Sequence, residues 1–92
     1  MKNDSIIDLD VRDLPAPEPL TRVLDLLNTT AQDVIICMIH RQNPCMLFDI
    51  LNKRGFSSRI IQKDDDQYLI YIWHPSNDCA PELITLDKSN VR

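Results

Sequence analysis

Alternation of apolar and polar residues predicts a strand, a helix and a second strand in the first part of the chain. Apolar residues alternate with aspartates over residues 6–11, as in a strand with one solvent-facing side. Prolines end this strand, and helical spacing follows at Leu20, Val23, Leu24 and Leu27. Residues 34–39 are apolar throughout, as is typical of a central strand covered on both faces.

A second helix and two further strands are predicted after residue 42. Asn43 is placed to cap the helix with Pro44 at its first position, and Gly55 ends the helix as a left-handed C-cap. Strands are then expected over residues 56–63 and 67–74, joined by an acidic turn.

The fold class follows from this order of elements and from the polarity of the strands. The crossover between the first two strands makes them parallel. The strands over 34–39 and 67–74 are apolar on both faces and belong in the middle, whereas those over 6–11 and 56–63 carry charged residues and belong at the edges. We therefore predict an α/β (α+β) fold of βαβαββ order: a two-layer sandwich with two helices on one face of a four-stranded mixed sheet.

The expected domain covers residues 6–74, and residues 75–92 form a C-terminal extension in which 83–86 can add a short strand. Two packing arrangements of the last predicted strand stay open. Tyr71 and Trp73 either face the side of the sheet without helices or pack under the helices. In both cases apolar surface is left over, so we expect the extension or a second copy of the chain to cover it.

Charge and composition narrow the classes of partner. With 92 residues, a net charge of −4 and scattered basic residues, the chain is a poor candidate for binding nucleic acid. It has no apolar run that suggests a membrane span, and residues 1–5 lack the apolar core of a signal peptide, so a cytoplasmic location is expected. A protein partner, self-association or a small anion fits the composition better.

The chain lacks the residue spacing of a metal site, and we predict no cofactor and no metal. Three cysteines form neither a metal-binding pattern nor an even-numbered disulfide framework, and Cys37 is expected in the core. His40 and His74 each end a predicted strand and are interpreted as surface residues. The acidic turn Asp64–Asp66 is interpreted as a solvated hairpin turn rather than a cation site.

One segment resembles a known family. Residues 9–12 read Leu-Asp-Val-Arg and residues 17–19 read Pro-Glu-Pro, which is similar to the signature of the TusA/SirA-like sulfur carriers, small bacterial proteins. The resemblance extends over residues 6–74 and implies the same order of elements. It places the sulfur-accepting cysteine of those proteins at Ala16, and Asp13 replaces their usual glycine. It therefore implies a subgroup without the motif cysteine, and alanine cannot carry sulfur.

The candidate site lies where both helices begin, because parallel strands end at the same edge of a sheet and helix N-termini favour anions. The candidate ligand-binding residues are Arg12, Glu18, Arg41, Asn43 and Cys45. These predict a non-enzymatic binding or regulatory module for a protein partner or small anion. Two alternatives are a sulfur carrier that uses Cys45 as a relocated, activated thiol, and an RNA-binding module.

Arg12 itself has two open interpretations. It can hold an anionic ligand at the helix edge, or it can form a structural salt bridge with Asp10, Asp13 or Glu18.

Overall fold

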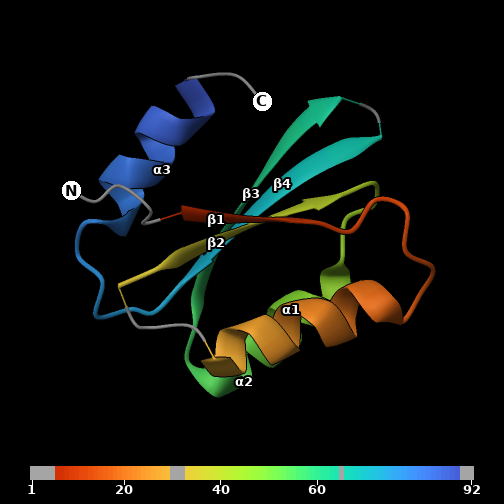
Figure 1. Cartoon of the computed structure of the whole chain (residues 1–92). Coiled ribbons are helices and arrows are strands. Elements are labelled where there is room, and N and C mark those ends of the chain that lie inside the picture. The colour runs from red at the N-terminus through yellow and green to blue at the C-terminus, as the bar shows by residue number, and fades with distance from the viewer. Residues whose placement is uncertain (1–5, 30–32, 65, 90–92) are drawn as a thin grey trace.

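The computed structural model describes residues 6–29, 33–64 and 66–89. Its elements are β1 (Ile6–Asp10), α1 (Glu18–Thr29), β2 (Ile35–His40), α2 (Cys45–Arg54), β3 (Ser57–Asp64), β4 (Gln67–Trp73) and α3 (Ala80–Ser89) (Figure 1). The first six confirm the predicted βαβαββ order, and α3 is an addition. None of the helices in these ranges has the length and apolar character needed to cross a membrane.

The four strands form one mixed sheet in the order β1-β2-β4-β3. β1 pairs with β2 in parallel, whereas β4 is antiparallel to both β2 and β3. This arrangement confirms that the two strands that are apolar on both faces are central. On the edge strand β1, the side chain of Ile7 is 38% exposed. The alternating pattern places Ile7 on the same side of the strand as Leu9 and Val11 and therefore predicts that it is buried.

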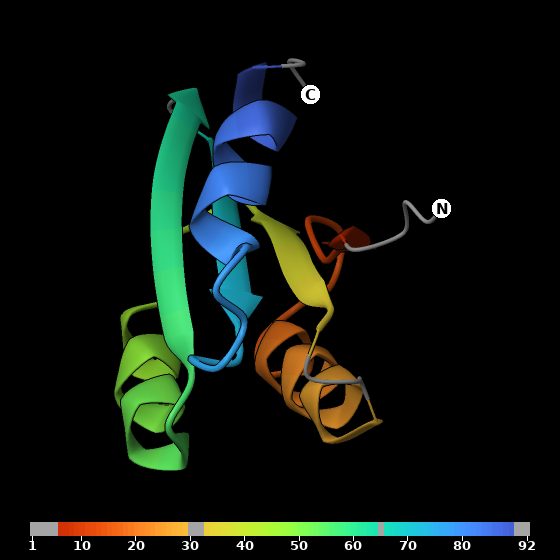
Figure 2. The same cartoon turned by 90° about the vertical axis from the view of Figure 1, so that its left-hand side faces the viewer.

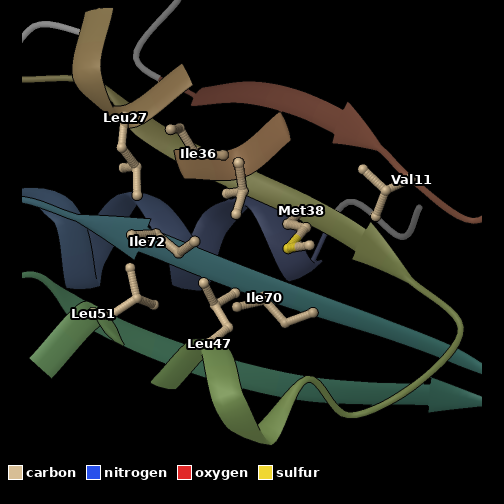
Figure 3. Close-up of a cluster of buried hydrophobic side chains, with 9 residues drawn as sticks. Val11, Leu27, Ile36, Met38, Leu47, Leu51, Ile70 and Ile72 are labelled. Atoms are coloured by element: carbon tan, nitrogen blue, oxygen red, sulfur yellow. The ribbon is translucent and has the colours of Figure 1, made fainter. Parts of the chain in front are cut away.

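One hydrophobic core fills the space between the sheet and the helices α1 and α2 (Figure 3). Its buried side chains come from both helices, the central strands and the residue that follows β1: Val11, Val23, Leu27, Ile36, Met38, Leu47, Leu51, Ile70 and Ile72. Leu20 and Leu24 pack partly buried against this cluster, which confirms the helical spacing in α1. Gly55 ends α2 with φ 84°, the left-handed conformation predicted for its C-cap.

A second core lies on the opposite face of the sheet, beneath α3 (Figures 1 and 2). Tyr71 and Leu69 are buried there, so the first of the two packing arrangements of β4 is the correct one. The extension does fold back over this face, as expected. However, residues 83–86 belong to a helix, and the prediction of a short strand is wrong; α3 adds a third layer to the predicted two.

The helical conformation of this segment has a local cause. Ala80, Leu83 and Ile84 stand at i, i+3 and i+4, which places them on one face of a helix, and all three pack in the second core. Pro81 and Glu82 lie in the first turn, where proline is tolerated and an acidic side chain suits the helix dipole. A strand would instead turn Leu83 and Ile84 to opposite sides.

Substitution of a single α3 residue tests this packing. Ile84 is fully buried, so Ile84→Ala is expected to lower the free energy of unfolding by about 2–4 kcal/mol through lost apolar burial and a residual cavity. The exposed Glu82 of the same helix is the control, and Glu82→Ala should change stability by less than about 0.5 kcal/mol. Urea denaturation of both variants measures the difference. Equal stabilities would show that α3 does not pack on the sheet.

Candidate ligand pocket between the β1–α1 and β2–α2 loops

Parallel pairing brings two loops together at one edge of the sheet. Asp10 is in register with Ile39, and the backbone N–H of Val11 continues the ladder by donating to the carbonyl oxygen of Ile39 at 3.0 Å. The β1–α1 loop (residues 11–17) and the β2–α2 loop (residues 41–44) therefore leave the sheet side by side (Figure 1). The β3–β4 turn lies at this same end, because β4 is antiparallel to β2.

The β1–α1 loop makes a compact turn into α1. The N–H of Leu14 donates to the carbonyl oxygen of Val11 at 3.2 Å, and the N–H of Glu18 donates to that of Pro15 at 2.9 Å. The peptide bond between Ala16 and Pro17 is cis. Because proline fixes φ and lacks an N–H, the loop presents side chains and carbonyl groups with few backbone donors.

The start of α2 differs from the prediction. Pro44 rather than Asn43 occupies the N-cap position, and no side chain caps the helix. The side-chain oxygen of Asn43 instead accepts the thiol of Cys45, with Sγ 3.8 Å from Oδ1. The carbonyl oxygen of Asn43 also accepts the N–H of Cys45 at 2.9 Å, which closes a tight turn in place of the predicted cap.

The two loops, the end of β2 and the first turns of both helices line an open pocket of ≈ 500 Å³, which we call the loop pocket. Three buried residues, Pro19, Met38 and Leu47, form its floor. Its other lining residues are partly or fully exposed: Arg12, Leu14, Pro15, Ala16, Pro17, Leu20, His40, Arg41, Gln42, Asn43, Pro44, Cys45 and Met46. The pocket therefore has an apolar floor, and its polar side chains come from Arg12 and the segment 40–45.

The structure brings most of the candidate residues together. Arg12, Arg41, Asn43 and Cys45 all line the loop pocket, as does Ala16. Glu18 does not. It begins α1 with an exposed side chain, while its neighbour Pro19 is buried in the floor.

Arg12 forms a structural salt bridge with Asp10, which was one of the two roles that its sequence position left open. Its Nε and Nη2 donate to the two carboxylate oxygens of Asp10 at 2.9 and 2.8 Å, and its backbone N–H donates to Oδ1 of Asp10 at 3.1 Å. These hydrogen bonds to Arg12 lower the pKa of Asp10, and the pair raises the pKa of Arg12. The guanidinium charge is thus largely matched within β1 and its loop.

His40 lines the loop pocket, although we interpreted it from the sequence as an ordinary surface histidine. It ends β2 and lines the pocket, whereas His74 follows β4 at the opposite end of the sheet. Burial, reinforced by the neighbouring charge of Arg41, lowers the pKa of His40. Its Nδ1 accepts the backbone N–H of Gln42 at 3.1 Å, so the neutral ring carries its proton on Nε2. The sequence signal was its position next to Arg41, at the edge where both helices begin.

The remaining reactive residues lie apart from one another. Cys37 is buried in β2, as predicted, whereas Cys45 and Cys79 are exposed, and none of the three forms a disulfide bond within the described residues. Within the described residues, no group of three or more His, Cys, Asp or Glu side chains could hold a metal ion. Asp64, the last residue of β3, and Asp66, which precedes β4, are both exposed; Asp65 of the predicted acidic run lies outside the described residues.

The fold and pocket define an α+β domain with a ligand-sized cavity where two strand-to-helix connections meet. A scan against family models matches residues 8–74 to "Uncharacterized conserved protein (DUF2249)", and the chain belongs to this family. Both loops of the pocket lie inside the matched region, whereas α3 lies outside it. Searches of curated proteins and of solved structures found no match.

The ion pair between Asp10 and Arg12 should make the stability of the protein depend on pH. Arg12→Gln removes the charged guanidinium and its paired hydrogen bonds to Asp10, so the pKa of Asp10 should rise toward its ordinary value of 3.8, observed as a higher midpoint in an NMR titration of its carboxyl carbon. Because the pKa of Asp10 is lowered in the folded state, its ionised carboxylate stabilises the fold at pH values above the ordinary pKa. This contribution is lost as the pH falls through the folded-state pKa. The stability difference between wild type and variant should therefore be present at neutral pH and vanish in acid.

Arg59→Gln is the matched control, because Arg59 is exposed on β3 at the far edge of the sheet from Asp10. It removes the same charge and should leave the Asp10 titration in place. An unchanged Asp10 midpoint in Arg12→Gln would contradict the ion pair.

Proposed function

We propose that this protein is a non-enzymatic binding or regulatory module whose ligand, a small anion or an anionic segment of a protein partner, occupies the loop pocket. The observation that carries the proposal is the joint construction of the pocket by two loops that are distant in sequence. Its volume of ≈ 500 Å³ falls within the range of roughly 300–1,000 Å³ typical of ligand sites. Like such sites, it combines an apolar floor with a few polar side chains.

We further propose that the domain is a relative of the TusA/SirA-like sulfur carriers that has exchanged sulfur transfer for binding. The order of elements and the segments at residues 9–12 and 17–19 support this relationship. Ala16, which stands where the resemblance puts the working cysteine, lines the pocket. A methyl group there adds apolar surface to a cavity and offers no nucleophile.

The contacts of Cys45 favour binding over thiol chemistry. The partner of its Sγ is the amide oxygen Oδ1 of Asn43, to which a thiol donates. A nucleophilic cysteine is instead activated by a neighbouring base or by donors that stabilise its thiolate, and an amide oxygen that accepts from the thiol does neither.

Sulfur transfer through Cys45 is the second candidate function, and its support is the exposure of this thiol at the edge of the pocket. Incubation with a cysteine desulfurase and cysteine, followed by mass spectrometry, separates the two functions. We expect no added sulfur atom on Cys45 beyond the level found on the exposed control Cys79. A persulfide formed on Cys45 and absent from Cys45→Ser would favour the sulfur carrier.

Binding to the pocket is tested by NMR titration of the ¹⁵N-labelled protein with octanoate, octanamide and inorganic phosphate. At least one probe should shift amide signals confined to residues 12–20 and 38–47. Ala16→Phe, which fills the exposed side of the pocket, should abolish those shifts. Asp25→Phe, on the exposed side of α1, should not. Absence of shifts with all three probes, or shifts centred on α3, would refute the proposed function.

A further inference from the structure

We infer that the loop pocket selects a small organic monoanion, a carboxylate with an apolar body, and that Arg41 rather than Arg12 binds its charged group. This inference rests on the proposed function and specifies its ligand. It follows from the polar groups of the pocket, from its apolar lining and from its size.

The charge of the lining is positive although the chain is acidic. The whole sequence has a net charge of −4, yet the described residues that line the pocket include two arginines and no Asp or Glu. Asp10 neutralises Arg12 through two side-chain hydrogen bonds. Among the described residues Arg41 forms no ion pair, so it provides the one uncompensated full charge of the lining.

The neighbours of Arg41 add hydrogen-bond donors. The Nδ1 atom of His40 already accepts the N–H of Gln42, which leaves its Nε2–H as a donor. The Oδ1 atom of Asn43 already accepts the thiol of Cys45, which leaves its NH₂ group as a donor. A ligand group that meets Arg41, His40 and Asn43 is thus expected to be an acceptor with a negative charge.

One full charge and two neutral donors suit a monoanion better than a phosphate dianion. Phosphate sites usually draw on successive backbone N–H groups of a glycine-rich loop or on several cations. The one glycine of this chain, Gly55, stands at the far end of α2, and the β1–α1 loop is rich in proline. A carboxylate needs only the bidentate donors that a single arginine provides.

The rest of the ligand is expected to be apolar. Met38, Leu47 and Pro19 form the floor, and Leu14, Ala16 and Leu20 also line the cavity. Met46 lies at the edge of the pocket and is 73% exposed, the most exposed large apolar side chain of the described residues. Covering Met46 with an alkyl or aryl group would remove apolar surface from water, which favours binding.

The size of the site favours a small molecule over a protein partner. A stable protein interface buries about 800 Å² on each partner over a broad surface. The loop pocket is a single concave site of ≈ 500 Å³, which a compound of drug size fills.

Calorimetric titration with octanoate and octanamide tests the inference, because these probes share an alkyl chain and differ in charge. Octanoate should bind wild type about tenfold more tightly than octanamide, as expected for a charge-assisted contact. Arg41→Gln should weaken octanoate binding about tenfold while leaving octanamide binding unchanged, which also shows that the variant is folded. Arg12→Gln should weaken octanoate binding by less than about threefold.

Three results would overturn the inference: equal affinity for both probes, tighter binding of phosphate than of octanoate, or a larger loss in Arg12→Gln than in Arg41→Gln. Each leaves the proposed function intact if the NMR shifts remain in the pocket. Loss of those shifts for every probe would instead refute the proposed function itself.

Discussion

Parallel pairing of β1 with β2 is the constraint on which the rest of the structure depends. Because two parallel strands end at the same edge of a sheet, the chain must leave that edge twice, each time into a helix on the same face. The register of Asp10 with Ile39 and the added hydrogen bond from Val11 bring the two exits close together. The loop pocket is the space between these exits, and the hydrophobic core beneath α1 and α2 holds both of its sides in place.

The two faces of the sheet serve different purposes. On one face, α1 and α2 bury their apolar side chains and present their first turns to the pocket. On the other, α3 covers Leu69 and Tyr71, and none of its described side chains lines the pocket. The match to the DUF2249 family ends at residue 74, so the pocket belongs to the conserved domain and α3 lies outside the matched region.

The strand order and the meeting of the two loops were predictable because they follow from strand polarity and from the crossover rule. The helical state of residues 83–86 was not, since a short apolar run fits a strand or a helix and the deciding partner, Ala80, is only weakly apolar. The partner of Arg12 was not predictable, because Asp10, Asp13 and Glu18 are all near it in the sequence. Side-chain geometry selects Asp10. The pocket role of His40 was predictable only in part, because its position beside Arg41 places it at the correct end of the sheet but does not fix the path of the β1–α1 loop next to it.

In the proposed binding mode, one ligand contacts the β1–α1 loop and the first turn of α2 at once. Isotope-filtered NMR of the labelled protein with unlabelled octanoate measures this directly through intermolecular nuclear Overhauser effects. A single bound alkyl chain should show contacts to the methyl groups of Leu14 or Ala16 and also to those of Met46 or Leu47. Contacts to only one of these two sides of the pocket, or to Ile84 and the face beneath α3, would contradict this binding mode.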